Sequence, residues 1–308
     1  MEVLPLGKII YMYQSSSFKG YLYAVIATIA LSNVYIFSKA ALNEVNLAQF
    51  GVYWFGFAII WNIIFSISTG KFKTIRSLSS FQKRQLFGIG IVEIIATVSI
   101  FIAIKIIPNP TIPSMLRNLE PVLIVILAAI ILQEKYNRIE SIGVILTLLG
   151  TIVISINKLN DFSQFFITGV EYVFISCVFY AIRTIWSKKV IHHFTAHALN
   201  LNKVVFLFIT SVIALLITKQ DLLVTNTALF YMFIGSLIGP FLTSYTQFLS
   251  FQHIDASRST LVMSTTGFIT LVLSYIYFGK LPYIYQILGG IITVFGLILL
   301  MYKRKQQA

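Results

Sequence analysis

The sequence has little charge for its length. Only 11% of its 308 residues are Asp, Glu, Lys or Arg, whereas 57% are hydrophobic, and the mean hydropathy is +0.87. Soluble domains carry about 25% charged residues to solvate their surfaces. The shortage of charge therefore excludes an ordinary soluble protein and predicts an integral membrane protein.

Cysteine and acidic residues are also scarce. The single cysteine, Cys177, excludes an internal disulfide and is expected to be a buried, inert thiol. Ten acidic residues against 23 Lys and Arg give a net charge of +13. Basic residues of membrane proteins collect in cytoplasmic loops, so this charge needs no nucleic-acid partner. The sequence contains no nucleophile elbow, phosphate loop or zinc motif, so we expect neither an enzyme nor a cofactor.

Three histidines lie close together in the sequence. His193 and His197 are four residues apart, which is a metal-ligand spacing, and His192 is adjacent. They follow Lys188 and Lys189, and no carboxylate or thiol is near them in the sequence. A solvated basic loop is therefore predicted here, and no metal site.

Long apolar runs divide the chain into ten segments of about 20 residues, each sufficient to span a bilayer. They cover residues 20–42, 47–68, 84–107, 110–133, 139–157, 166–187, 200–218, 227–251, 258–279 and 282–302. The connections are too short for a soluble domain. Residues 1–19 lack the features of a signal or transit peptide, and we interpret them as a short juxtamembrane arm.

The distribution of Lys and Arg predicts the orientation. With the N-terminus inside, the inner segments hold 16 of these residues and the outer ends hold 5. The inner set is Lys8, Lys19, Lys71, Lys73, Arg76, Lys83, Arg84, Lys135, Arg138, Lys188, Lys189, Lys203, Arg258, Lys303, Arg304 and Lys305, and the outer set is Lys39, Lys105, Lys158, Lys219 and Lys280. This bias places both termini in the cytoplasm. Because no targeting segment is visible, a bacterial inner membrane is the default location, and an organelle membrane is the alternative.

The chain contains an internal repeat, because its two halves are similar in sequence. The segment from Gly20 resembles the segment from Gly169, and further matches occur in the second part of each half. The matched pairs include Ser38–Lys39 with Ser187–Lys188 at an offset of 149, and Gly143 with Gly289 and Gly150 with Gly296 at an offset of 146. Two repeats are predicted, over residues 1–157 and 158–308. Since five spans is an odd number, the halves are expected to insert in opposite directions. The predicted fold class is an all-α membrane protein with ten transmembrane helices in two inverted five-helix repeats.

These features resemble the drug/metabolite transporter superfamily. "LEPVLIVILAAIILQEKYNRIESIGVILTLLGTIVI", from Leu119, is similar to the EamA-type pattern, in which a proline follows a small or acidic residue, the helix ends near Gly-Glu, and a glycine-rich span follows. The second copy, "TTGFITLVLSYIYFGKLPYIYQILGGIITVFGLILL", carries Lys280 where Glu is usual. The resemblance covers nearly the whole chain and implies a transporter.

Some stretches resemble the triose-phosphate/sugar-phosphate translocator branch. These are "NVYIFSKAAL", "FYAIRTIWSKKVI" and "SMLRNLEP". The resemblance places Arg117 where that branch has a phosphate-gripping lysine. Its Lys-Arg pair in the ninth helix is replaced by Thr266 and Gly267, so a broader EamA-like permease or exporter is favoured over triose-phosphate exchange.

Charged residues inside apolar spans are the leading site candidates. A charge at mid-bilayer costs roughly 3 kcal/mol on insertion scales and usually faces a cavity or a partner. Arg117 and Glu120 share one helix face at i, i+3. Either they form a self-contained ion pair, or Arg117 points into a central cavity and Glu120 orients it. Glu93, near the middle of the third span, either pairs with Arg117 as a fixed counter-ion or titrates and couples proton movement.

The remaining substrate-binding candidates are polar residues on other spans. Thr260 and Ser264 lie on a stripe of small residues in the ninth span, which either contacts substrate or lets helices approach closely. Tyr180 and Arg183 lie on the sixth span, where Arg183 either faces the site or snorkels to the headgroups. Weaker candidates for the cavity wall are Asn33 and Tyr245. We expect the cavity to be bordered by spans one, three, four, six, eight and nine.

The favoured function is secondary-active transport of a small polar metabolite, with an anion preferred, by alternating access. One alternative is a sugar-phosphate or nucleotide-sugar exchanger. Another is a non-transporting membrane scaffold or lipid-handling accessory protein. The expected partners are a small-molecule substrate, the lipid bilayer, and either a proton or a counter-substrate.

Overall fold

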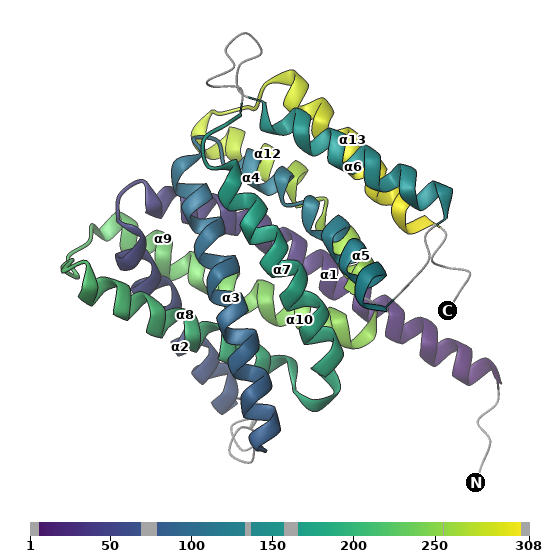
Figure 1. Ribbon diagram of the computed structural model, residues 1–308. Helices are drawn as coiled ribbons and strands as arrows, with labels where there is room; N and C mark the ends of the chain where they lie inside the picture. The colour runs from purple at the N-terminus through teal and green to yellow at the C-terminus, as the bar shows by residue number, and fades with distance from the viewer. Residues whose placement is uncertain (1–5, 69–78, 133–136, 157–165, 255, 303–308) are drawn as a thin grey trace.

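A computed structural model describes residues 6–68, 79–132, 137–156, 166–254 and 256–302. All regular elements in these ranges are helices (Figure 1). The α-helices are α1 (Leu6–Leu42), α2 (Leu47–Ser68), α3 (Ser80–Ile106), α4 (Thr111–Leu116), α5 (Leu119–Leu132), α6 (Arg138–Ser155), α7 (Val170–Val190), α8 (Ala196–Ile217), α9 (Asn226–Ser236), α10 (Ser244–His253), α11 (Ala256–Met263), α12 (Thr266–Phe278) and α13 (Ile284–Tyr302). A 3₁₀ turn, η3 (Ile191–His193), follows α7, and a π-helical segment, η4 (Leu237–Thr243), joins α9 to α10.

Every predicted apolar span coincides with a helix or a helix pair. Within the described residues, eight helices are long and apolar enough to cross a membrane, and a shorter apolar helix covers Ile284–Leu299. The α4–α5 pair is not among them. The chain is thus an all-α, multi-pass membrane protein. The prediction of a separate juxtamembrane arm is corrected as well. Residues 6–19 form the first part of α1 instead of preceding it.

Two of the predicted spans are broken at equivalent points of the two halves. The fourth span breaks between α4 and α5 at Arg117 and Asn118. Pro121 cannot donate to the Arg117 carbonyl, which instead accepts from the Glu120 amide at 2.9 Å. The ninth span breaks at Ser264 and Thr265, where hydroxyl groups bond to carbonyls three residues back and compete with the helical ladder.

The eighth span changes its hydrogen-bond register rather than breaking. Pro240 lies inside η4 and lacks a backbone donor. The ladder accommodates it as a π-helix, which widens the helix locally. Gly239, in the same segment, lets Trp54 of α2 approach the backbone.

Glycines pack α6 against α13. A Cβ on Gly150 would lie 2.6 Å from the Gly289 carbonyl oxygen, and one on Gly296 would lie 2.8 Å from that of Gly143. The Thr147 hydroxyl lies 3.4 Å from the Thr293 carbonyl oxygen. Small residues permit this close approach, which supplies the packing that holds helices together in lipid. The pair forms one edge of the bundle (Figure 1).

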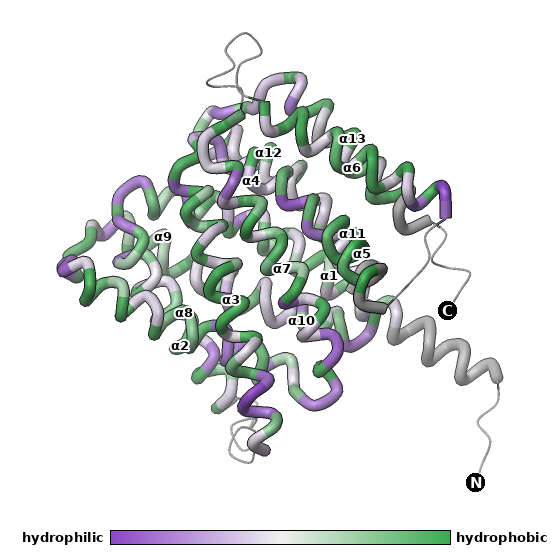
Figure 2. Tube along the Cα trace, viewed as in Figure 1, coloured by the Kyte–Doolittle hydropathy of each residue, from purple (hydrophilic) through white to green (hydrophobic). Residues whose placement is uncertain are grey.

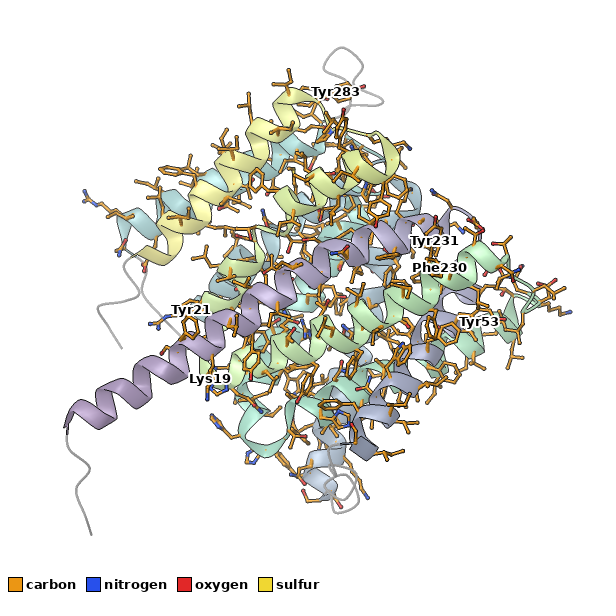
Figure 3. All side chains as sticks on the ribbon, turned by 180° about the vertical axis from the view of Figure 1, so that it is seen from behind. Lys19, Tyr21, Tyr53, Phe230, Tyr231 and Tyr283 are labelled. Carbon is orange, nitrogen blue, oxygen red and sulfur yellow. The ribbon has the colours of Figure 1, made fainter. Side chains whose placement is uncertain are left out.

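The surface is that of a membrane protein. Hydrophobic residues dominate the outer helices and hydrophilic residues gather near helix ends (Figure 2). Tyr53, Phe230 and Tyr283 lie toward one end of the bundle, and Lys19 and Tyr21 toward the other (Figure 3). Aromatic and basic residues at such positions suit the two membrane–water interfaces.

The histidine prediction is corrected for His197. This side chain is only 2% exposed, and its Nε2 lies 2.5 Å from the Ser66 hydroxyl. Thr195 caps α8, which begins at Ala196, four residues earlier than predicted. His197 is therefore buried on α8 against α2, not part of a solvated loop.

We predict that Gly150→Ala destabilises the protein. In an unobstructed helix this change would stabilise by about 1 kcal/mol, but here the new methyl meets backbone of α13, and overpacking costs about 1–3 kcal/mol. Thermal unfolding in detergent should show a lower Tm. The control is Leu149→Ala, since Leu149 is 52% exposed. A raised Tm for Gly150→Ala would show that the two helices are not in contact.

Candidate functional site

Tyr180 of α7 lies at the centre of a buried group of charged residues. Its hydroxyl is 2.9 Å from the Thr97 hydroxyl of α3. The guanidinium carbon of Arg117 lies 4.3 Å from the centre of its ring, and that of Arg183 lies 5.2 Å from it. Arginine stacks favourably on an aromatic face, so Tyr180 links the broken fourth span to α7.

Glu93 of α3 joins three helices. One carboxylate oxygen lies 2.9 Å from the Lys203 ammonium of α8, and the other lies 3.4 Å from Arg183 Nε. The Thr97 hydroxyl donates to the same carboxylate at 2.9 Å. Glu93 and Arg183 are each 1% exposed. Arg183 is thus buried rather than snorkelled, and the partners of Glu93 are Arg183 and Lys203 instead of Arg117.

Arg117 and Glu120 form the predicted pair across the helix break. Arg117 Nε lies 3.0 Å from a Glu120 oxygen. The other Glu120 oxygen accepts from the Thr184 hydroxyl of α7 at 3.3 Å. The Arg117 guanidinium also stacks on the Tyr180 ring and borders a cavity. The pair is therefore not closed on itself.

Two cavities meet at Arg117. The larger, of about 60 Å³, is also lined by Arg183 and Lys203. The smaller, of about 30 Å³, is lined by Glu120 as well. Tyr35 of α1 and Gln247 of α10 border both. The two volumes accommodate only a few water-sized groups, so the protein is seen with its centre nearly closed.

The two cavities are lined by all six spans that the sequence predicts to border a central cavity, and also by α2 and α8. The additional lining residues are Trp54 and Phe55 of α2 and Lys203 of α8. The larger cavity is lined by aromatic and aliphatic side chains and by the cations Arg117, Arg183 and Lys203. The chemistry of this lining suits a molecule with an apolar part and a negatively charged part.

The other predicted residues divide into two groups. Thr260 and Ser264 line the smaller cavity. Asn33 and Tyr245 line neither one. The Asn33 amide donates to the Ile29 carbonyl at 2.9 Å, and the Tyr245 ring packs against Phe65, 5.1 Å between centroids.

Sequence reasoning missed Lys203 and Gln247. Lys203 was predicted to lie in one of the inner segments, but its side chain is 14% exposed and pairs with Glu93. The signal was Thr195, whose hydroxyl accepts from the Ala198 amide at the start of α8. An N-cap there places Lys203 two turns inside the helix. Gln247 gave no comparable signal, since one amide in an apolar span is common.

Two lysines in the orientation count are thus buried inside the protein. Without Lys203, the inner segments hold 15 Lys and Arg residues instead of 16. Without Lys39, which is 5% exposed, the outer ends hold 4 instead of 5. The excess of basic residues on the inner side therefore remains. Lys71, Lys73, Arg76, Lys135, Lys158 and Lys303–Lys305 lie outside the described residues.

Comparison with known proteins gives the family. Residues 18–156 and, separately, residues 167–302 match the EamA-like transporter family. The chain belongs to the EamA-like transporter family. Two matches to one family confirm that this transporter is built from two repeats, and they confirm the resemblance seen in the sequence.

Two individual relatives are consistent with the family. The "Uncharacterized transporter YxxF" of Bacillus subtilis (strain 168) is 25% identical over 205 residues, which cover 64% of the EamA-like chain and 63% of that relative. A crystal structure described only as that of a protein superposes with a TM-score of 0.65 at 16% identity, over 96% of this chain and 99% of the other. At that identity the second likeness shows the fold alone.

We predict that Glu93→Gln destabilises this EamA-like transporter strongly. The change leaves Lys203 and Arg183 as buried cations without a carboxylate, and breaking a buried ion pair costs about 3–5 kcal/mol. Thermal unfolding should show a large loss in Tm. The double variant Glu93→Gln/Lys203→Met should recover part of it, because it removes one of the two cations. Glu44→Gln, at an exposed acid, is the control. Equal Tm values for Glu93→Gln and this control would refute the role of the ion network.

Proposed function

We propose that the protein is a secondary-active transporter that moves a small anionic metabolite by alternating access. One observation carries the proposal: Arg117 lies at a helix break and borders both central cavities. A planar guanidinium donates paired hydrogen bonds to a carboxylate or phosphate. Helices interrupted near a central cavity are where transporters of this architecture bind substrate.

The direction of the helices supports inverted repeats and ten spans. Lys39 near the end of α1 contacts the end of α3, so α1 and α3 run the same way. Along α3 and α7, Gln85 meets Trp186 and Thr97 meets Tyr180, so these two run in opposite directions. The first helix of the second half therefore opposes the first helix of the first half, as inversion requires. Ten spans follow if each interrupted pair counts as one.

The two halves carry matching lysine contacts at opposite ends of the bundle. The Lys39 ammonium donates to the carbonyls of Ile104, Lys105 and Ile107, at 2.9, 3.0 and 2.9 Å. The equivalent Lys188 donates to the carbonyls of Phe251 and Ile254, at 2.7 and 3.3 Å. Each cation binds the electronegative end of a helix, α3 or α10. We interpret these contacts as two latches, and both are closed when the cavities are closed.

The alternatives receive less support. A sugar-phosphate exchanger would need a second cationic pair on the ninth span, where Thr266 and Gly267 lie instead. A scaffold would not need Arg117 to face a cavity. The location in a bacterial inner membrane, the cytoplasmic termini and the coupling to a proton or a counter-substrate remain predictions.

We predict that Arg117→Ala abolishes transport and leaves the protein at near-normal abundance. The site then lacks the group that binds the anion. Arg117→Lys should transport poorly, because lysine keeps the charge but loses the planar fork. The measurement is uptake of a pooled anion library into proteoliposomes, with and without a pH gradient.

Arg84→Gln, at an exposed arginine of α3, is the control for loss of a positive charge. The double variant Arg117→Gln/Glu120→Gln keeps hydrogen-bonding groups without leaving Glu120 unpaired. If Arg117→Ala transports normally, or if neither variant accumulates, the arginine is structural and this proposal fails.

We predict that removing either latch opens one end. A reporter, Ser244→Cys, lies in the larger cavity, and the native Cys177 is buried and unreactive. With the predicted orientation, Lys39→Met should raise labelling by an impermeant thiol reagent from outside several-fold, and Lys188→Met from inside. The controls are the exposed neighbours Lys105→Met and Lys189→Met. The reverse pattern would invert the topology, and no change would refute the latches.

A further inference from the structure

The charges around the two cavities do not cancel. Among the described residues, this group contains three cations, Arg117, Arg183 and Lys203, and two carboxylates, Glu93 and Glu120. Each of the five is deeply buried, the most exposed side chains being 14% accessible. An unbalanced charge inside a membrane protein is costly. The best explanation of the one surplus positive charge is that a negatively charged group of a ligand pairs with it.

Arg183 holds donors that lack acceptors. Its Nε and Nη1 have no hydrogen-bond partner among the described residues, and the Glu93 oxygen lies 3.4 Å from Nε. Its Nη2 reaches Gln247 only at 3.4 Å. Buried polar groups are nearly always hydrogen-bonded, and this side chain is 1% exposed and lines the larger cavity. Because Nε faces Glu93, the edge of the Arg183 guanidinium that can receive two oxygens of one group is the one formed by Nη1 and Nη2.

Much of the lining of the larger cavity is apolar. It includes Trp54 and Phe55 of α2, Ile100 and Phe101 of α3, and Leu31 of α1. The neutral polar side chains of the lining are Tyr35, Thr97, Tyr180, Thr243, Ser244 and Gln247. The ligand therefore has an apolar body, and any further polar group on it is uncharged.

The occupied carboxylates argue against an ammonium group on the ligand. Glu93 already binds two cations, and Glu120 binds Arg117 and Thr184. The ammonium group of an amino acid would be buried with no free carboxylate to pair with. Because an amino acid is a zwitterion, the net charge of the site would stay at one positive charge. A dianion such as phosphate or a dicarboxylate would change the net charge of the site to one negative charge. Only a single negative charge neutralises the site.

We propose that the substrate is a small monocarboxylate with an apolar body and no amine, such as a branched or aromatic oxo or hydroxy acid, and that Arg183 grips its carboxylate together with Arg117. This rests on the proposed function and narrows it. It also makes Arg183 a second substrate-binding residue, on α7, in a site whose first arginine lies on the broken fourth span.

The test is binding to the purified full-length protein, by calorimetric titration and by ligand-induced change in Tm. The probes are 4-methyl-2-oxopentanoate, leucine with the same carbon skeleton, the neutral 4-methyl-2-oxopentanamide, the dianion 2-oxoglutarate, and inorganic phosphate. We expect the oxo acid to bind at least tenfold more tightly than each of the others. Counterflow in proteoliposomes should rank the probes in the same order.

The outcomes separate the two proposals. If phosphate or 2-oxoglutarate binds best, transport of an anion stands but the single charge and apolar body are wrong. If leucine or the amide binds best, the anionic substrate itself is wrong. If no probe binds, the narrower inference fails, and the anion-library uptake described above decides the broader one separately.

Variants of Arg183 test its role. Arg183→Lys keeps the positive charge beside Glu93 and should still fold, but it should weaken binding of the oxo acid at least tenfold because the paired donors are lost. Arg84→Gln should bind normally. If Arg183→Lys folds and binds the oxo acid with unchanged affinity, Arg183 does not grip the carboxylate. If it fails to fold, Gln247→Leu, which removes the Gln247 oxygen that Arg183 Nη2 contacts, should still alter affinity, and unchanged affinity there would also refute the role.

Discussion

The ion pairs of Glu93 hold the centre of this protein together. In lipid, helices gain little from burying apolar surface, because the acyl chains are as apolar as leucine. Polar contacts between helices therefore decide which faces meet. Glu93 places α3 against both α7 and α8, and Tyr180 extends the same group to the broken fourth span through its contact with Arg117. One carboxylate thus positions most of the candidate site.

The interrupted helices depend on that centre. A break inside a membrane span exposes backbone groups that lipid cannot satisfy, so breaks occur where protein or a wet cavity surrounds them. The break at Arg117 lies against α7, where the Cys177 thiol comes within 4.0 Å of the Arg117 carbonyl oxygen. The π-segment around Pro240 lies beside Trp54 and the larger cavity. The free backbone groups at these positions and the buried charged side chains both need a polar environment, so they occur at the same place in the protein.

The periphery follows different rules. α6 and α13 meet through glycines and threonines at matching positions of the two halves. Close van der Waals contact holds this edge, whereas ion pairs hold the centre. Such a division suits a transporter, since a centre held by ion pairs can exchange partners with a charged substrate while a tightly packed edge keeps its shape.

The sequence by itself determined the class, the helices and the repeat. Long apolar runs are local signals, and a span of about 20 residues needs no tertiary information to be seen. It also placed Arg117, Glu120 and Glu93 at the centre, because a charge deep in an apolar run must face other protein. Tertiary structure alone decided the pairing. Glu93 is joined to Lys203, which lies 110 residues away in the chain, and Asn33 and Tyr245 lie outside the cavities although their spans border them. Helical periodicity shows which residues share a face, but the rotation of each helix, and hence the face that meets a partner, is set only when all the helices pack.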